Sequence, residues 1–325
     1  MNDAMEKPMS NSENQPDLSR RNVLGCAAIG AVSTALGGCA TLDGSPRPRG
    51  AVRGRIKQSV AYWCYETVDW TVAQTVYAAK SLGCKSVELV DPKDWELLRS
   101  NGLKCAIALN GISGPPFVRG LNNLTYRDEV IGGAKRMIDA CAGSDGLCKQ
   151  VIAFTGYKYR DAEDPTSGEI SLEEGAENCV NGLKTLGEYA APKNVTISIE
   201  MLNTRDDTHE MKGHPGYQGD DIDYVAEIVK RVGMPNVKLL FDIYHVQIMN
   251  GDLIRRIRQY RDIISHIHVA GNPGRGELHL NQEIYYPAIM QALIEMGYDG
   301  YVGQEFLPTI DPMDGLRAAV TLCDV

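Results

Sequence analysis

Eight short apolar segments alternate with longer helix-like segments after residue 55, and this alternation constrains the fold more than any other feature. The strand-length segments are Ile56–Trp63, Ser86–Val90, Cys105–Leu109, Gln150–Phe154, Val195–Glu200, Val237–Asp242, Ile263–Val269 and Gly300–Glu305. The helix-like segments include Val68–Leu82, Arg127–Cys141, Leu172–Ala190, Asp221–Val232, Gly251–Tyr260 and Glu283–Met296. Repeated strand–helix units give parallel strands joined by right-handed crossovers, and eight units close into a barrel. We therefore predict an α/β fold, a single-domain (β/α)8 barrel over residues 55–325.

Charge and motif content narrow the classes of partner. The chain of 325 residues has a formal net charge of -9 and no long stripe of Lys and Arg. Neutralisation of phosphates supplies most of the affinity for nucleic acid, so an acidic chain of this kind is a poor nucleic-acid binder. No Gly-x-Gly-x-x-Gly follows the first strand segment, which argues against a dinucleotide-binding fold. We expect a small polar substrate.

Residues 1–54 have the pattern of an export signal and a tether. Arg20 and Arg21 precede a weakly apolar run, Val23–Leu36, which is shorter than the roughly 20 residues that span a bilayer. This pattern resembles a twin-arginine signal. The run ends in Gly37-Gly38-Cys39, which resembles a bacterial lipobox and would make Cys39 a lipidated residue. We expect a periplasmic or lipid-anchored protein; a leader with a chance Arg-Arg pair is the alternative.

Seven cysteines follow the export segment, and none forms a Cys-x-x-Cys pair, so a zinc or redox motif is not indicated. Cys105 lies in an apolar segment and is expected in the core. Cys141 and Cys148 are close enough in sequence to close a short disulfide loop in an oxidising compartment. A twin-arginine route, which carries folded proteins, would leave them reduced, and the sequence does not decide between the two states.

Metal-binding side chains stand at the ends of four consecutive strand segments. These are Glu200, Asp242, His268 and Glu305. The carboxyl ends of the strands of a (β/α)8 barrel meet at one rim, where such enzymes have their active sites. Three carboxylates would repel one another there unless a cation lay between them. Three oxygens and one imidazole nitrogen suit one divalent ion, Mn²⁺, Mg²⁺ or Co²⁺, and Zn²⁺ is also compatible. The seventh segment also contains His266, which we expect to pack against a helix while His268 faces the barrel axis.

Several motifs resemble the hydroxypyruvate isomerase group of the xylose isomerase-like TIM barrels. They are Gly83–Leu89, Glu200–Asp206, His214–Tyr217, Phe241–His245 and Gly297–Phe306, and the resemblance extends over about Ile56–Pro308. It implies that Glu200, Asp242, His268 and Glu305 are metal ligands. It also implies that Glu200 and Glu305 accept and donate the transferred proton and that His245 contacts the substrate.

The chain departs from that group in two places. His268 stands where hydroxypyruvate isomerases carry Gln, whereas the related ketose 3-epimerases carry His. The segment Asp206–Gly213 lengthens the loop after the fifth strand segment and adds His209, with His214 directly after it. Both departures concern the identity of the substrate more than the chemistry.

Five further residues are candidate substrate contacts. They are Glu88, Asn203, His214, Tyr217 and Arg275. Glu88 would either bind substrate or anchor a neighbouring lysine. Arg275 would clamp an anionic group with its planar donor fork, or it would be a solvated loop cation.

The site predicts an enzyme that moves a proton next to a carbonyl. The metal would polarise an α-hydroxycarbonyl substrate and stabilise the enediolate formed when one glutamate removes the α-proton. Return of the proton gives a metal-dependent isomerase or epimerase of a sugar or α-hydroxycarbonyl acid. Two alternatives remain open: a lyase or dehydratase that acts on an oxidised sugar or glycoside outside the cytoplasm, and a non-catalytic carbohydrate-binding lipoprotein. A homo-oligomer is compatible with each. The superfamily's abasic-site endonucleases need more histidines and a basic face than this chain has.

Overall fold

Parallel strands of the predicted barrel occupy the centre of the computed structural model, which describes residues 53–325. The predicted export signal and the lipobox at Cys39 lie outside the described residues. The strands are β1 (Lys57–Ala61), β2 (Ser86–Glu88), β3 (Gln150–Phe154), β6 (Thr196–Glu200), β7 (Val237–Asp242), β8 (Ile264–Val269) and β9 (Tyr301–Gln304). They are ordered β2-β1-β9-β8-β7-β6-β3, and each neighbouring pair is parallel.

An irregular extended segment, residues 104–108, lies between β2 and β3 and joins the two edges of this sheet. It pairs only through isolated parallel bridges, Ser86 with Lys104, Cys105 with Cys148, and Ala108 with Val151. Val87 N donates to Lys104 O and Leu89 N donates to Ile107 O. A step of two residues along β2 and its end therefore matches a step of three residues along the segment. An extra residue of this kind disrupts a ladder locally. The third predicted strand, Cys105–Leu109, is therefore present as a bulged connection and not as a regular strand.

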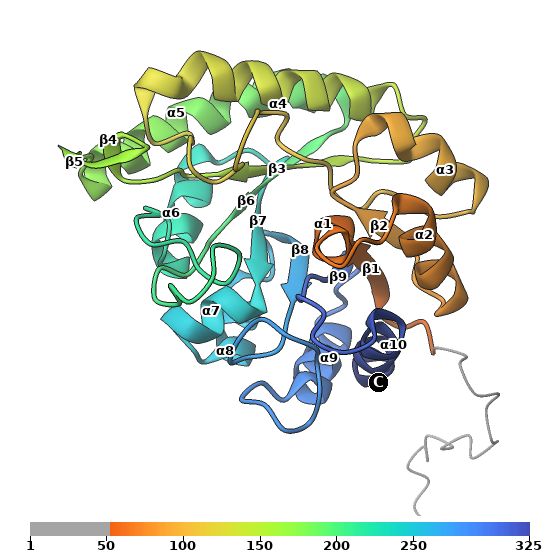
Figure 1. Cartoon of the computed structure of the whole chain (residues 1–325). Helices are drawn as coiled ribbons and strands as arrows, with labels where there is room; N and C mark the ends of the chain where they lie inside the picture. Colours follow the sequence, from red (N-terminus) through yellow and green to blue (C-terminus); the bar gives the residue numbers. More distant parts are fainter. Residues whose placement is uncertain (1–52) are drawn as a thin grey trace, which may run out of the picture. The chain divides into compact units, whose positions relative to one another are not determined.

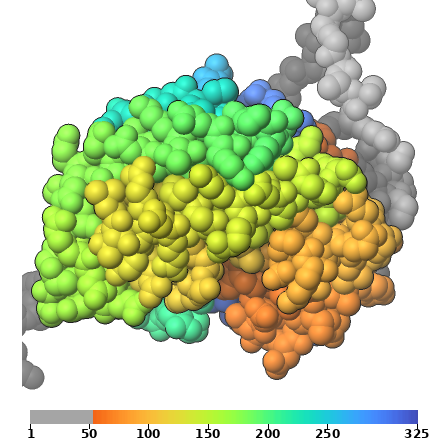
Figure 2. All heavy atoms as spheres, turned by 90° about the horizontal axis from the view of Figure 1, so that it is seen from above, coloured from red at the N-terminus to blue at the C-terminus, as the bar shows by residue number. Residues whose placement is uncertain are grey.

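Helices surround the strands, as Figure 1 shows. They are α1 (Tyr62–Glu66), α2 (Val72–Ser81), α3 (Trp95–Ser100), α4 (Arg127–Ala142), α5 (Leu172–Ala190), α6 (Ile222–Val232), α7 (Ile243–Met249), α8 (Leu253–Tyr260), α9 (Tyr286–Glu295) and α10 (Pro312–Cys323). In the space-filling view of Figure 2, yellow-green and green segments lie side by side, in agreement with the packing of α4 against α5. The architecture confirms the predicted (β/α)8 barrel.

Capping side chains set the helix boundaries. Helix α2 begins four residues later than its predicted segment, because Thr71 and Gln74 form a capping box at its start. Helix α6 begins after Asp221, whose carboxylate accepts two backbone N–H groups, and it ends at Gly233 in a left-handed conformation. The predicted limits of α5 match those observed.

One polar feature stands apart from the barrel core. An antiparallel hairpin, β4 (Tyr159–Asp161) and β5 (Asp164–Glu169), projects from the connection after β3 (Figure 1) and was not predicted. Its side chains are mostly exposed, so it lacks the apolar alternation that marks a buried strand. Among residues 53–325, no helix is both long and apolar enough to cross a bilayer.

The seven cysteines of the described barrel are buried and free. Cys105 lies in the apolar core, as predicted. Cys141 and Cys148 carry no disulfide, so the reduced alternative is the state observed.

Candidate active site

The four strand-end residues converge at the barrel mouth. Glu200 ends β6, Asp242 ends β7, His268 lies one residue before the end of β8, and Glu305 follows β9. One ligand atom from each lies within 4.8 Å of the others, and all four side chains are buried. The strands deliver them to one point because the carboxyl ends of parallel barrel strands share a rim.

The interior of this cluster contains a carboxylate oxygen that has no partner. His268 Nδ1 lies 3.2 Å from Glu200 Oε1 and 3.0 Å from Glu305 Oε2. Asp242 Oδ2 is buried without a hydrogen bond, and its nearest cationic atom, Arg275 Nη2, is 3.7 Å away. Leaving a buried charged oxygen unpaired is unfavourable by more than about 1–3 kcal/mol. Three carboxylates and one imidazole nitrogen therefore form a donor set that fits a divalent cation.

Burial is the largest single influence on the pKa of each of these groups. It raises the pKa of Asp242 to about 7, and together with the charge of Glu305 it raises the pKa of Glu200. At Glu305, His268 and Arg275 outweigh burial and hold the pKa well below its usual value. At His268, the charge of Glu305 and the hydrogen bonds with carboxylates outweigh burial and raise the pKa well above its usual value. The ion-free site therefore retains protons that a cation would displace.

Asp242 also forms the start of α7. Its Oδ1 accepts hydrogen bonds from Tyr244 N at 2.7 Å and His245 N at 3.1 Å, so it is the N-cap of the helix. Because β7 passes directly into α7, one oxygen caps the helix while the other, Oδ2, faces the cluster. The cap fixes the orientation of this candidate ligand.

Arg275 is a buried counter-charge of the site, with only 2% of its surface exposed. Its Nη2 lies 2.5 Å from Glu305 Oε2, and its Nη1 donates to Met211 O at 2.7 Å. The guanidinium also lies 5.1 Å from the ring centre of Trp63, whose Nε1 donates to Glu305 Oε1 at 2.9 Å. The alternative of a solvated loop cation is therefore wrong.

A cavity of about 200 Å³ opens beside the cluster. Its lining has a charged part and a larger apolar part. Its charged residues are Glu200, Glu305 and Arg275, next to the candidate metal ligands. Most of the remaining lining is apolar and comprises Trp63, Leu89, Leu109, Pro116, Phe117, Ile152, Phe154, Leu202 and Met211. His214 completes the lining, packed 4.0 Å from the ring of Phe117, and burial with the charge of Arg275 lowers its pKa to about 3.

Three predicted substrate contacts, His245, Asn203 and Tyr217, do not line the cavity. His245 Nδ1 accepts from Asn203 N at 3.0 Å, so its proton is on Nε2, which is buried without a partner 3.7 Å from Asp242 Oδ2. Asn203 is itself engaged with His245 and with Lys212 O. Tyr217 donates to the backbone of Glu200 at 2.8 Å and does not line the cavity, so it supports the strand end. Of these three, His245 alone keeps a ring N–H without a partner, and it too is absent from the cavity lining.

Glu88 and His266 occupy places that the sequence analysis did not predict. Both histidines of β8 point to the same side, because residues two apart on a strand share a face. The expectation that His266 packs against a helix is wrong: its Nε2 lies 3.1 Å from Glu88 Oε1. Glu88 is fully buried and is absent from the cavity lining, so it does not stand where a substrate contact would. Burial opposes ionisation of Glu88, but His266 and His268 hold its pKa at about 2.

Comparisons with known proteins identify the family of this chain. The profile of the xylose isomerase-like TIM barrel family matches residues 76–322. The 2-oxo-tetronate isomerase of Cupriavidus necator is 30% identical over 249 residues, which cover 74% of this chain and 88% of that protein. The hydroxypyruvate isomerase of Escherichia coli is 27% identical over 247 residues, 74% of this chain and 89% of its own length.

Solved structures share the fold. A crystal structure of AP endonuclease, family 2, from Brucella melitensis has a TM-score of 0.66 at 24% identity, and covers 80% of this chain and 97% of its own. A zinc-bound structure of the IOLI protein has a TM-score of 0.63 at 17% identity, with 82% and 96% covered. At such identities the likeness concerns the fold alone.

Proposed function

Because this chain belongs to the xylose isomerase-like TIM barrel family, we propose that it is a metal-dependent isomerase of a short α-hydroxycarbonyl acid. The observation that carries the proposal is the presence of two glutamates, Glu200 and Glu305, on one small cavity beside His268 and Asp242. A binding protein does not need a pair of carboxylates placed on two strands at this point. The relatives named as 2-oxo-tetronate and hydroxypyruvate isomerases support the same reaction class.

The lining of the cavity supports a short substrate. A ketohexose carries a hydroxyl group on almost every carbon, and hydroxyls placed against Leu109, Ile152 or Phe154 would find no partner there. Each buried hydroxyl without a hydrogen bond is unfavourable by roughly 1–3 kcal/mol. A three- or four-carbon keto-acid keeps its polar atoms at the charged end of the cavity. Its carboxylate can pair with the guanidinium of Arg275, which lines that end.

Different residues of the site would have different roles in the reaction. A divalent cation held by Glu200, Asp242, His268 and Glu305 would supply Lewis-acid polarisation of the substrate carbonyl. Glu200 ends β6 and Glu305 follows β9, with the strands β7 and β8 between them in the sheet, so their carboxylates would reach the substrate from different sides. One removes the proton on the carbon next to the carbonyl, and the other returns it. In the ion-free site the pKa of Glu200 is raised and that of Glu305 is lowered.

The experiment is incubation of the metal-replete protein in deuterated water with hydroxypyruvate, a 2-oxo-tetronate and a ketohexose. Product formation is followed by NMR, and the position of deuterium shows where the proton returns. We expect the carbonyl to move to the neighbouring carbon, which gives an aldehyde from hydroxypyruvate and a 3-oxo acid from the 2-oxo-tetronate, with deuterium at the former carbonyl carbon. Glu305→Gln should lower the rate by about 10²–10⁴-fold, the usual contribution of general acid–base catalysis. The thermal unfolding midpoint of the variant serves as the control for folding.

Three other outcomes would overturn the proposal. Inversion at one carbon without movement of the carbonyl would indicate an epimerase. Loss of water or of an aglycone would indicate the lyase alternative. Saturable binding of the substrates without any turnover would indicate a binding protein. Full activity of Glu305→Gln would remove this residue from the proton transfer.

A further inference from the structure

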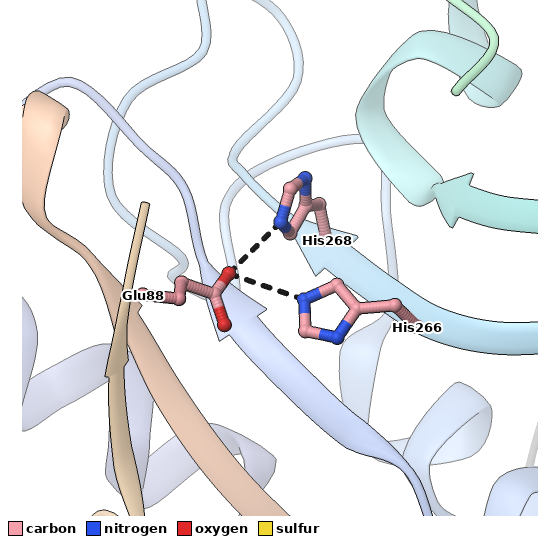
Figure 3. A group of neighbouring side chains, drawn as sticks. All are labelled: Glu88, His266 and His268. Atoms are coloured by element: carbon pink, nitrogen blue, oxygen red, sulfur yellow. Dashed lines mark hydrogen bonds and ion pairs between the residues drawn. The ribbon is translucent and has the colours of Figure 1, made fainter. Parts of the chain in front are cut away.

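We propose that Glu88 is a positioning residue that fixes the proton of His268 on Nε2 and so presents Nδ1 to the metal. This inference rests on the metal site of the proposed function. It adds to that site a buried triad made of Glu88, His266 and the candidate ligand His268. Figure 3 shows one carboxylate oxygen of Glu88 facing a ring nitrogen of both His266 and His268. None of the three side chains is exposed.

The two ring nitrogens of His268 contact different partners. Its Nε2 lies 2.9 Å from Glu88 Oε1, on the inner side of the barrel. Its Nδ1 lies 3.2 Å from Glu200 Oε1 and 3.0 Å from Glu305 Oε2, within the candidate metal cluster. One ring nitrogen is therefore bound to a carboxylate outside the cluster, and the other is directed into it.

Hydrogen-bond chemistry then decides which nitrogen can be a ligand. An ionised carboxylate only accepts hydrogen bonds, so a bond between Glu88 and Nε2 requires the proton to be on Nε2. A neutral imidazole carries one proton, which leaves the lone pair of Nδ1 free for a cation. A carboxylate behind a metal-binding histidine fixes its tautomer and ring orientation and strengthens its basicity. Glu88 has the geometry of such a partner.

Two neighbours hold the carboxylate of Glu88 in place. His266 Nε2 lies 3.1 Å from the same oxygen, Oε1, so this oxygen accepts from both rings. The rings of His266 and His268 are almost perpendicular, at 88°, with centroids 4.8 Å apart. On the adjacent strand β9, a Cβ atom at Gly303 would lie 2.2 Å from Glu88 Oε1 and 2.8 Å from His268 Cδ2. Only a glycine at this position leaves room for the triad.

The triad does not form a second metal site of its own. Both Nε2 atoms contact one carboxylate oxygen at hydrogen-bond distance, so each carries a proton where a metal would need a lone pair. We therefore expect one ion per chain.

The test is titration of the metal-free protein with Mn²⁺ by isothermal calorimetry, which does not depend on turnover. Glu88→Leu removes the acceptor and should raise the Mn²⁺ dissociation constant about 10–100-fold, the usual effect of losing such a partner. Glu88→Gln should have a smaller effect, because its amide oxygen can still accept from Nε2. A matched control is Glu277→Gln: Glu277 is a buried glutamate that accepts from Thr309 N at 2.6 Å and Ile310 N at 3.1 Å outside the cluster. It should leave the dissociation constant unchanged.

Two further measurements separate positioning from a general structural effect. In Mg²⁺- or Zn²⁺-loaded protein labelled with ¹⁵N-histidine, NMR should find the His268 proton on Nε2 in the wild type. That signature should be lost in Glu88→Leu and retained in Glu88→Gln. Gly303→Ala leaves Glu88 in the sequence, but its Cβ would displace the carboxylate of Glu88 and also press on His268 Cδ2, so it should weaken Mn²⁺ binding at least as much as Glu88→Leu. Circular dichroism verifies that each variant is folded.

The outcomes distinguish this inference from the proposed function. Wild-type affinity in folded Glu88→Leu, or a proton on Nδ1 in the loaded wild type, would overturn the role of Glu88 and leave the metal site standing. Two ions per chain, one of them lost in Glu88→Leu, would also overturn it. A wild type that binds no Mn²⁺ would instead contradict the metal dependence of the proposed function.

Discussion

At the residue scale, the charges of the site are nearly balanced without an ion. Glu200, Asp242 and Glu305 supply three carboxylates, and His268 and Arg275 supply two cationic groups when both are protonated. The balance is completed by a proton, because burial raises the pKa of Asp242 to about 7. A divalent cation would enter by displacing protons from Asp242 and His268, while Arg275 remains paired with Glu305.

This balance predicts that the affinity for Mn²⁺ falls as the pH is lowered. Below about pH 7 the ion-free site holds a proton on Asp242, and His268 holds one to higher pH, since its pKa is raised well above the usual value. Each proton that must leave should weaken binding about tenfold per pH unit. Calorimetry between pH 5.5 and 7.5, in buffers with different heats of ionisation, measures both the affinity and the proton release. A constant affinity with no proton release would contradict this assignment.

The same pKa shift predicts how the stability of the ion-free protein depends on pH. The folded pKa of Asp242 lies above its unfolded value, so the neutral carboxyl of the folded state is favoured at low pH. The stability from this group is fully present below about pH 4 and is lost as the pH rises through 7. Urea unfolding with a chelator present should show this loss, and it should be smaller in Asp242→Asn, where only the raised pKa of Glu200 still contributes. An identical pH dependence in the variant would exclude Asp242 as its source.

The sequence predicted the four candidate ligands but not their immediate partners. Glu200, Asp242, His268 and Glu305 were accessible because strand ends can be located from apolar segments and parallel strands share a rim. His266 was misplaced, although the spacing of two in His-Ile-His already places both rings on one face of the strand. The burial of Arg275 could not be predicted, because it depends on contacts with residues 64 and 30 positions away in sequence.

At the scale of elements, the junction between β7 and α7 gives Asp242 two tasks that can be separated. Asp242→Asn keeps an oxygen that can cap α7 but removes the charge that faces the cluster. Asp242→Ala removes both. The Asn variant should therefore be more stable than the Ala variant by about 1 kcal/mol, the usual contribution of an N-cap, while both lose tight Mn²⁺ binding. Chemical denaturation and calorimetry measure the two effects; equal stabilities would show that the cap contributes nothing.

Regular helices and strands were predictable where their apolar residues repeat with one clear period. Irregular elements have no such repeat and were not predictable. The limits of α5 could be read from its long apolar repeat, and α2 was misjudged by four residues because the capping box at Thr71 decides its start. The bulge in residues 104–108 depends on how this segment pairs with β2. The local sequence pattern of the segment does not contain that information. The short helix α7 was hidden because a strand passes into it without a loop.

At the scale of the whole molecule, the barrel follows from the number of strand–helix units, since eight units close the sheet. The conformations of the loops cannot be predicted from the number of units. In this protein the loops supply Arg275, His214 and most of the apolar lining of the cavity. The metal cluster was therefore more predictable than the shape of the space beside it. The substrate is determined by that space.

Export is a proposal that concerns the whole chain. Residues 1–54 have the features of a twin-arginine signal, a lipobox and a tether, and the described barrel contains no membrane-spanning helix. We expect Arg20→Lys combined with Arg21→Lys to retain the protein in the cytoplasm, because the paired arginines are the export feature. Cys39→Ser should release the exported protein from the membrane fraction. Fractionation with antibody detection tests both; membrane association that survives Cys39→Ser would contradict lipid anchoring.

The most direct test of the site is anomalous diffraction from crystals grown with saturating Mn²⁺. We predict one anomalous peak per chain at the barrel mouth, in contact with carboxylate oxygens of Glu200, Asp242 and Glu305 and with Nδ1 of His268. No peak at this point, or a Mn²⁺ ion bound elsewhere while these side chains bind none, would contradict the account.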